Sequence, residues 1–247
     1  MGHPGALPAN LNSVPVLARD VLARPTLEAA RDLVGCRLVA DEPVAGRIDG
    51  RIVEVEAYIG EADQASHARF GPTPRNRPMY GEPGHAYLYL VYGMYTCLNV
   101  VTEPSEQPAA VLIRAVELTD GVDAARSLRL AQESSVKSAR LDPLLRARIA
   151  ARIAAVPGER LASGPGLVGA AFGLAVSLTG LDLCDPASAV RLEPPRPEDP
   201  VPAIVATPRV GIGYAGEPWV SMPWRFAMAG ARAVSGARTV SGARTIR

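Results

Sequence analysis

The sequence predicts a single domain that mixes helices and strands. Its 247 residues are 48% hydrophobic and 21% charged, which is enough apolar material for one sizeable core, although the length alone also allows two small domains. Runs of β-branched and aromatic residues predict strands, and apolar residues at helical spacing predict helices. We expect this domain to span residues 16–230, with a flexible lead at 1–15 and a flexible tail at 231–247.

The elements are predicted in the following order. Pro25 occupies a favoured first position of a helix, Leu27, Ala30 and Leu33 share one face of it, and Gly35 ends it. Further along the chain we expect strands at 36–40 and 47–58, a short helix-like segment at 61–69, a loop at 71–84, a β-hairpin at 87–92 and 95–101 with its turn at 93–94, a buried strand at 109–116, helices at 121–132 and 142–154, a loop entering a helix at 163–166, and short strands near 190, 204–209 and 224–227.

The two ends lack features of a targeting signal or a membrane anchor. The lead carries neither a basic leader nor an uninterrupted apolar stretch, and no run in the chain approaches the length of a transmembrane helix. The tail repeats the motif Ser-Gly-Ala-Arg-Thr from Ser235 and again from Ser241. Two copies without an apolar face cannot form a packed repeat, so we expect a flexible, weakly basic tail. Because the chain shows no targeting signal and no transmembrane run, we expect a cytoplasmic protein.

The charged residues and cysteines exclude some classes of site. The net charge is +1 and Lys137 is the only lysine, so the positive charge is almost entirely arginine, which binds phosphates and stacks on flat rings. Cys36, Cys97 and Cys184 are isolated in the sequence and their number is odd. We therefore expect reduced cysteines, no disulfide framework, no metal site and no cofactor.

The segment from residue 53 to residue 99 concentrates the side chains that can carry chemistry. Glu54, Glu56 and Tyr58 are two residues apart, so a strand projects all three from one face. The hairpin that follows is rich in tyrosine and Gly93 lies at its turn. A tyrosine-rich strand beside two carboxylates and a loop of proline and arginine predicts a pocket for a flat molecule.

Each of these residues also has a simpler interpretation. Two carboxylates on one strand are typical of a glycosidase pair, but they can equally be solvated strand residues. His67 by itself is more often a packed or surface histidine, and the tyrosines can be ordinary core residues of a sheet. Arg114 is the single charge in a nearly continuous apolar strand, and such a buried charge requires a partner.

Six sequence blocks together resemble the alkyladenine (3-methyladenine) DNA glycosylase family. The blocks are VEVEAYIG, the acidic stretch that ends at His67, TPRNRPMYG, AYLYLVYGMYTCLNVV, VLIRAVE and PRVGIGYAGE. The resemblance extends from Leu17 to Ala229 and is densest between Val53 and Glu117. It implies an α+β fold with a curved, mostly antiparallel sheet, flanking helices and a protruding β-hairpin. Glycosylases of similar name that are built on a helix-hairpin-helix do not share these blocks.

The resemblance implies a reaction and its catalytic residues. The reaction is hydrolysis of the N-glycosidic bond of alkylated or otherwise damaged purines in DNA, which leaves an abasic site. Glu56 is implied as the general base that activates water, and Arg114 with the backbone carbonyl of Val210 is implied to hold that water. Because no lysine lies within a motif, we expect a monofunctional enzyme that does not cut the strand.

The resemblance also implies how DNA is bound. Tyr58, His67 and Tyr89 are implied to sandwich the extruded base, and Asn99 is implied to lie against the purine edge. Tyr92 is implied to fill the gap that the extruded base leaves in the duplex. Arg75 and Arg225 are implied to contact the DNA. The chain departs from the family at Leu167, where a lysine is usual, and this leaves one DNA contact in doubt.

The expected partner is double-stranded DNA that contains damaged purines. We expect no membrane partner and no obligate protein partner, and thus a monomer. Two alternatives come from other classes of function. One is a glycosidase or nucleosidase that uses Glu54 and Glu56 as a pair on a substrate other than DNA, and the other is a protein that binds DNA lesions without catalysis.

Overall fold

The structure is a computed structural model that describes residues 15–137, 142–235 and 245–246. It contains one ten-stranded antiparallel sheet with the strand order β10-β8-β9-β2-β5-β4-β3, in which β1 also pairs with β2 and β7, and β6 pairs with β5. The strands are β1 (Arg37–Glu42), β2 (Gly46–Ile59), β3 (Ala86–Val91), β4 (Tyr95–Val101), β5 (Ala109–Asp120), β6 (Ala162–Ser163), β7 (Val190–Glu193), β8 (Ile204–Thr207), β9 (Arg225–Met228) and β10 (Thr245–Ile246). The predicted α+β class with a curved antiparallel sheet is confirmed.

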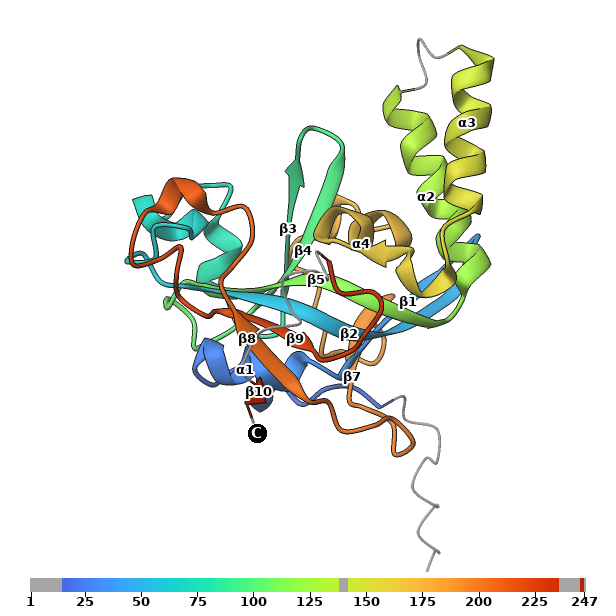
Figure 1. Ribbon diagram of the computed structural model, residues 1–247. Coiled ribbons are helices and arrows are strands. Elements are labelled where there is room, and N and C mark those ends of the chain that lie inside the picture. Colours follow the sequence, from blue (N-terminus) through green and yellow to red (C-terminus); the bar gives the residue numbers. More distant parts are fainter. Residues whose placement is uncertain (1–14, 138–141, 236–244, 247) are drawn as a thin grey trace, which may run out of the picture.

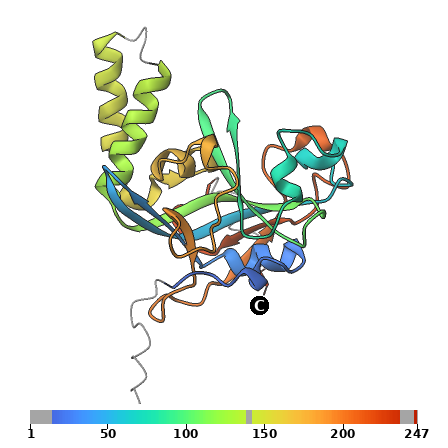
Figure 2. The same cartoon turned by 180° about the vertical axis from the view of Figure 1, so that it is seen from behind.

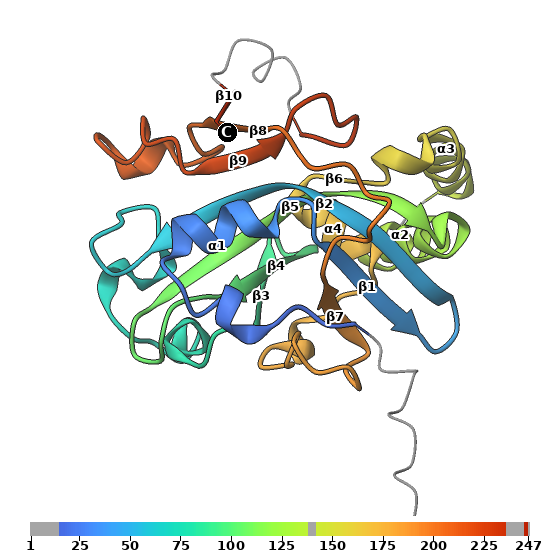
Figure 3. The same ribbon diagram turned by 90° about the horizontal axis from the view of Figure 1, so that it is seen from below.

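Four α-helices flank the sheet, namely α1 (Thr26–Leu33), α2 (Val122–Lys137), α3 (Pro143–Ala154) and α4 (Pro165–Ala171). Short 3-10 helices lie at Arg19–Val21, His67–Phe70, Arg77–Tyr80, Gly158–Arg160, Val176–Leu178 and Gly213–Ala215. Figure 1 and the reverse view in Figure 2 show α2, α3, α4 and the β3–β4 hairpin on one side of the sheet. Helix α1 covers the other side, as Figure 3 shows from below. None of the described helices has the length and apolar content needed to cross a bilayer.

Strands β2 and β5 form the centre of the fold. Val53, Val55 and Ala57 of β2 are fully buried, as is Ile113 of β5. The pairing of β2 with β5 shifts register on both sides of Glu54, which marks β-bulges. A bulge re-aims the side chains beside it, and here the irregularity lies at Glu54, within the acidic segment of β2.

The β3–β4 hairpin ends in a tight turn that differs by one residue from the predicted turn. Its central residues are Tyr92 and Gly93, with φ angles of 52° and 66°, and the Met94 N–H donates to the Val91 carbonyl oxygen at 3.1 Å. Two successive positive φ angles define a type I′ turn, which favours asparagine and glycine. Tyrosine disfavours this conformation, so the turn places an 86% exposed aromatic side chain at the tip at some cost in stability.

The segment predicted as helix-like at 61–69 is largely turn, and this prediction was wrong for most of its length. Asp63 accepts hydrogen bonds from the backbone N–H groups of Ala65 at 3.0 Å and Ile59 at 3.3 Å. Such bonds offer the backbone an alternative to a helix. A helical turn begins only at His67, after the Ser66 hydroxyl caps the Ala68 N–H at 3.1 Å.

The packed domain extends further toward the C-terminus than the predicted boundary at residue 231. Ala233 is 0% exposed and Val234 is 3% exposed, and Ser235 is hydrogen bonded within the sheet. Residues 1–14 of the lead predicted at 1–15, and most of the repeat after Ser235, lie outside the described residues. The expected flexibility of both ends therefore stays a prediction.

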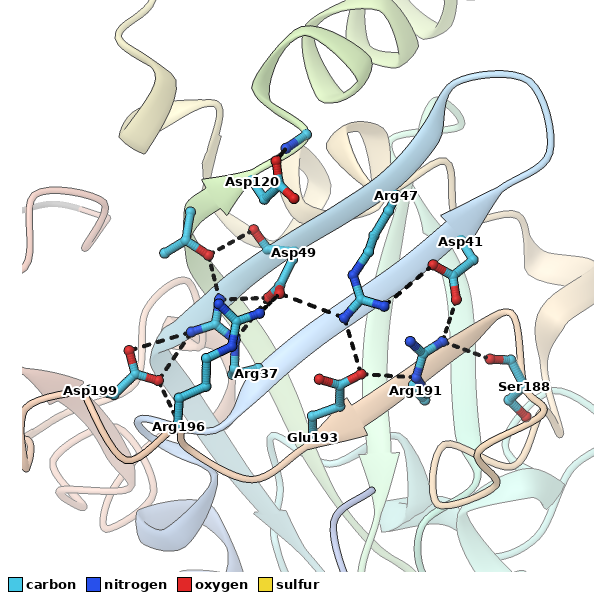
Figure 4. Close-up of polar contacts among 12 residues, drawn as sticks. Arg37, Asp41, Arg47, Asp49, Asp120, Ser188, Arg191, Glu193, Arg196 and Asp199 are labelled. Carbon is cyan, nitrogen blue, oxygen red and sulfur yellow. Dashed lines mark hydrogen bonds and ion pairs between the residues drawn. The ribbon is translucent and has the colours of Figure 1, made fainter. Parts of the chain in front are cut away.

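A network of ion pairs attaches the connector after β7 to the sheet (Figure 4). Arg37 and Asp49, each with a side chain 1% exposed, pair at 2.7 Å. Asp199 of the connector pairs with Arg37 at 3.1 Å, and Arg196 pairs with Asp49. Breaking one partner of a buried pair is costly, so this network fixes the path of the chain from β7 to β8.

Candidate functional site

The carboxylate of Glu56 lies at the centre of the candidate site. It is fully buried on β2. Its Oε2 accepts hydrogen bonds from the Tyr58 hydroxyl at 2.9 Å and from Arg114 at 3.2 Å. Its Oε1 accepts one from the Val210 backbone N–H at 2.7 Å. An ionised carboxylate offers about four acceptor positions, so these three donors leave one position, on Oε1, for a further donor.

Glu54 has a different environment although it projects from the same face of β2. Its Oε1 accepts hydrogen bonds from Arg114 at 2.8 Å, from Arg225 at 2.6 Å and from the Ser235 hydroxyl at 2.9 Å. Its Oε2 accepts one from the Ser235 N–H at 2.7 Å. Burial alone would raise the pKa of Glu54, but the two arginines and the Ser235 N–H lower it below its ordinary value. Glu54 is thus an ionised anchor whose four hydrogen-bond donors all come from the protein.

Arg114 connects the two carboxylates. It lies on β5, is 7% exposed, and donates to Glu54 through Nε and to Glu56 through Nη1. Burial opposes its charge, yet Glu56 and Glu54 together raise the pKa of Arg114 above its ordinary value. The prediction that this buried charge requires a partner is confirmed. The side chain also reaches the wall of the groove above the site.

An aromatic cavity adjoins Glu56. It is lined by Tyr58, Ala65, His67, Met79, Tyr87, Tyr89, Asn99 and Tyr214. The His67 and Tyr89 rings are in edge contact, with centroids 4.5 Å apart, and Tyr87 lies 5.7 Å from Tyr89. The three residues predicted to sandwich a base, Tyr58, His67 and Tyr89, therefore line one cavity.

His67 is neutral in this cavity at neutral pH. Its Nδ1 shares a hydrogen bond of 2.9 Å with the Tyr87 hydroxyl. Burial, followed by the positive charges of Arg75 and Arg69, lowers the pKa of His67 to about 4. An uncharged imidazole does not repel a cationic ring, so His67 suits a positively charged ligand.

Asn99 presents a side-chain amide to the cavity. It lies on β4 directly opposite Tyr87 of β3, is 4% exposed, and its Nδ2 donates to the Tyr87 carbonyl oxygen at 3.0 Å. This bond fixes the orientation of the amide. A fixed polar group against an otherwise aromatic wall can discriminate between ligand edges.

A wider groove opens from the cavity toward the hairpin tip. Its walls include Arg75, Tyr92, Arg114, Val210 and the segment from Gly164 to Leu167. Arg75 is exposed and its guanidinium lies 5.7 Å from the centre of the Tyr89 ring. Tyr92 stands at the tip of the hairpin. The structure thus brings Arg75 and Tyr92, which were both predicted to contact DNA, to the groove that opens from the aromatic cavity.

Arg225 does not lie where it was predicted to contact DNA. It is 1% exposed on β9, donates to Glu54 at 2.6 Å and to the Thr207 hydroxyl at 3.1 Å. These bonds turn its guanidinium into the protein, because β9 pairs with β2 beside Glu54. The structure corrects this prediction: Arg225 supports the carboxylate cluster and has no exposed guanidinium to offer to a phosphate.

Several residues at the site were missed by sequence reasoning. Arg209 is buried behind the pocket, where it pairs with Asp63 at 2.6 Å and lies 4.8 Å from the centre of the Tyr58 ring. Ser235 holds Glu54, and Tyr214 closes one side of the cavity. The signal for Tyr214 was its place in the PRVGIGYAGE block. Ser235 gave no signal, because its role depends on a contact across 181 residues.

The described residues contain no group of three or more histidine, cysteine, aspartate or glutamate side chains that could hold a metal ion. Cys36 and Cys97 are buried as free thiols, and burial raises the pKa of Cys97 to about 11.

Comparison with known proteins gives consistent matches over most of the chain. The family model for methylpurine-DNA glycosylases matches residues 20–232. A Methanocella arvoryzae protein, provisionally named a 3-methyladenine DNA glycosylase, is 47% identical over 213 residues, which are 86% of this chain and 92% of that protein. Human DNA-3-methyladenine glycosylase is 38% identical over 216 residues, which are 87% of this chain and 66% of the human protein. The family match contains Glu56 and the aromatic cavity but stops before Ser235.

Proposed function

Because the chain belongs to the methylpurine-DNA glycosylase family and is thus a DNA glycosylase of DNA repair, we propose that it hydrolyses the N-glycosidic bond of alkylated and otherwise damaged purines with Glu56 as general base. In this reaction Glu56 accepts a proton from water, the water oxygen bonds to C1′ of the sugar, and the bond from C1′ to the purine breaks. The electron pair of that bond leaves with the purine, where it neutralises the positive charge of an alkylated base, while an uncharged damaged base takes up a proton as it leaves. The products are a free base and an abasic site. The proposed enzyme is monofunctional.

The observation that carries this assignment is the contrast between the two glutamates. Glu54 receives four hydrogen bonds and is held ionised by Arg114 and Arg225. Glu56 receives three and keeps one acceptor position beside Arg114 and Val210, both of which line the groove. A general base must accept a hydrogen bond from the water it activates. This contrast also opposes a glycosidase mechanism in which both glutamates act as a pair.

The role of Val210 follows a more specific geometry than the sequence implied. Its backbone N–H points at Glu56, at 2.7 Å. This N–H holds the Glu56 carboxylate in place. The carbonyl oxygen of Val210 remains the group that the family resemblance implies for orienting the water, and we propose that role for it. Arg114 pairs with Oε2 of Glu56 at 3.2 Å, so Oε1 is the oxygen proposed to accept the proton of the water.

Base recognition is proposed to depend on stacking and charge. A base within a duplex is out of reach, so the nucleotide must rotate out of the stack at a cost of a few kcal/mol. Tyr58, His67 and Tyr89 offer ring faces and edges to the extruded base. Alkylated purines carry positive charge, and an aromatic face attracts a cation by about 0.5 to 2 kcal/mol. The neutral His67 adds no repulsion, so the cavity favours damaged bases over normal ones.

Tyr92 and Arg75 are proposed to hold the opened duplex. Tyr92 is 86% exposed at the hairpin tip, where its side chain can enter the space that the base leaves. Arg75 lies at the mouth of the cavity, above the Tyr89 ring. A side chain inserted between base pairs offsets part of the unstacking cost.

Incubation of the protein with duplex oligonucleotides tests the proposal directly. Separate duplexes would carry 3-methyladenine, 7-methylguanine, ethenoadenine or hypoxanthine, and the free base and the abasic site would both be measured. We expect base release without strand cleavage. Tight binding to a lesion without base release would instead establish a lesion-binding protein, and release from free nucleosides at the same rate would establish a nucleosidase.

A further inference from the structure

A second cavity lies at the base of the α2–α3 helix pair, beside the groove that opens from the aromatic cavity. We refer to that groove as the catalytic groove. The walls of the second cavity are made by α2, α3, the segment that follows α3, β6 and the start of α4, and its lining residues are Arg129, Arg152, Ala155, Val156, Pro157, Arg160, Ser163 and Leu167. Three of these residues are arginines, and no acidic residue lines the cavity. We call it the arginine cavity.

The arginines of this cavity are only partly neutralised by the described residues. Glu133 is the carboxylate that pairs with them, at 2.9 Å from Arg152 and 3.7 Å from Arg129. Arg160 is exposed, and its guanidinium has no hydrogen bond or ion pair with any described residue. Glu159 interacts electrostatically with Arg160, but its ion pair is with Arg232 at 3.4 Å. Two carboxylates therefore serve four guanidinium groups, and the cavity keeps an excess of positive charge.

Arg129 provides a second and independent observation that favours an anionic ligand. It is 6% exposed and donates from Nη1 to the Leu161 carbonyl oxygen at 2.9 Å, yet its buried Nε–H has no partner among the described residues. Buried N–H groups of charged side chains are rarely left unpaired. Burial also lowers the pKa of the Arg129 guanidinium although Glu133 lies beside it. An anionic oxygen in the cavity would relieve both conditions.

The arginine cavity adjoins the groove that opens from the aromatic cavity. Leu167 lines both this cavity and the catalytic groove, so the two share a wall. Gln132 of α2 donates to the Met94 carbonyl oxygen at 2.6 Å, which attaches α2 to the hairpin next to its tip. In Figures 1 and 2 the hairpin and the α2–α3 pair rise from the same side of the sheet with α4 beside them. A duplex opened by Tyr92 would pass close to the arginine cavity.

We propose that the arginine cavity binds a backbone phosphate of the DNA strand next to the damaged nucleotide, with Arg129, Arg152 and Arg160 as its donors. Guanidinium groups bind phosphate through paired N–H donors. Leu167 itself brings no charge to this wall, so the arginines of α2, of α3 and of the segment after α3 supply it. The proposal rests on the proposed function only in taking lesion-containing duplex DNA as the substrate.

The test combines a protein variant with a neutralised phosphate. Binding of an ethenoadenine duplex would be measured for the wild type and for Arg160→Gln, which removes the exposed and unpaired guanidinium without touching the core. A set of duplexes would carry one neutral methylphosphonate each, at successive positions on both sides of the lesion. Arg148→Gln is the matched control. Arg148 lies on α3 and is exposed, as Arg160 is, but it does not line the cavity.

We expect Arg160→Gln to weaken binding by roughly 10-fold, as for the loss of one charge-assisted hydrogen bond, and to reduce the slope of log K against log salt by about 0.9. At one flanking position the methylphosphonate should weaken wild-type binding to a similar extent and have little further effect in Arg160→Gln. The single-turnover rate of base release at saturating enzyme should stay unchanged, because Arg160 lines neither the aromatic cavity nor the groove that opens from it.

Two outcomes would overturn the proposal while leaving the glycosylase assignment intact. In the first, Arg148→Gln reduces the affinity and the salt slope as much as Arg160→Gln, which would make the effect a general one of surface charge. In the second, no methylphosphonate position loses its effect in Arg160→Gln. Failure of the wild type to release base from any lesion would count instead against the proposed function, and the binding data would still decide whether the arginine cavity holds a phosphate.

Discussion

Replacing Glu56 by glutamine separates the chemistry of the site from its architecture. The backbone N–H of Val210 cannot turn, so the glutamine oxygen should take the place of Oε1, which accepts that bond at 2.7 Å. The new NH₂ group then faces Arg114 Nη1, now 3.2 Å from Oε2. Two donors facing each other in a buried site cost about 1 to 3 kcal/mol. We therefore expect Glu56→Gln to fold with a moderately reduced free energy of unfolding.

The catalytic effect of the same change should be much larger than its effect on binding. A general base contributes about 10²- to 10⁴-fold to the rate, and an amide cannot accept the proton of the water. We expect the single-turnover rate of base release to fall by that factor while the affinity for an ethenoadenine duplex changes by no more than about 10-fold. Fluorescence titration would give the affinity, and release of the base from a duplex at saturating enzyme would give the rate.

Glu54→Gln is the informative comparison, because it changes the other carboxylate by the same atoms. Glu54 compensates both Arg114 and Arg225, and removing one partner of a buried pair costs about 3 to 5 kcal/mol. Its main effect should thus appear in the free energy of unfolding, measured with urea. If folded Glu56→Gln releases base within 10-fold of the wild-type rate while folded Glu54→Gln does not, Glu54 is the base and the assignment made from their hydrogen bonds is wrong.

Three further predictions concern the hairpin tip, the cavity wall and its histidine. Tyr92→Asn should raise the free energy of unfolding by about 0.5 to 1 kcal/mol, because asparagine suits a φ angle of 52°. The same change should slow excision from duplex DNA more than excision from single strands. Equal slowing on both substrates would place Tyr92 in the pocket. Asn99→Ala should release normal guanine roughly 10- to 100-fold faster than the wild type and retain action on 3-methyladenine, because it removes the amide that crowds the guanine amino group; an unchanged ratio of the two bases would refute this role. On acidification the unfolded chain protonates His67 near its ordinary pKa of 6.5 whereas the folded protein does so at about 4, so stability should fall between these pH values; urea titrations at pH 7 and pH 5 should show a smaller loss for His67→Phe than for the wild type, and equal losses would contradict the lowered pKa.

Features that depend on neighbouring residues could be predicted from the sequence. The hairpin follows from tyrosines and β-branched residues on both sides of Gly93, and the alternation of Glu56 and Tyr58 places both on one face of β2. The hydrogen bond of 2.9 Å between these two side chains agrees with that placement. The position of the turn was wrong by one residue, because Tyr92 adopts a positive φ angle that ordinary preferences assign to glycine or asparagine.

Features that depend on tertiary contacts could not be predicted. Arg225 was expected near DNA, since arginine in a late strand has no local signal for the direction it faces, and only the pairing of β9 with β2 turns it toward Glu54. Asp63 converted an expected helix into a turn by bonding backbone groups and Arg209. The four hydrogen bonds of Glu54 distinguish it from Glu56, and two of them come from Ser235 at the far end of the domain.

The contacts of Ser235 with Glu54 determine when the carboxylate cluster can be completed during synthesis of the chain. Glu54 and its hydroxyl and amide donors are separated by 181 residues. As a chain emerges during synthesis, β2 can pair with β5 well before residue 235 has been added, since both strands are complete by residue 120. At that stage Glu54 and Arg114 already share the core, but Arg225 and Ser235 are absent. Glu54 and Arg114 therefore gain their full set of described partners only after residue 235 has been added and has packed against the carboxylate cluster.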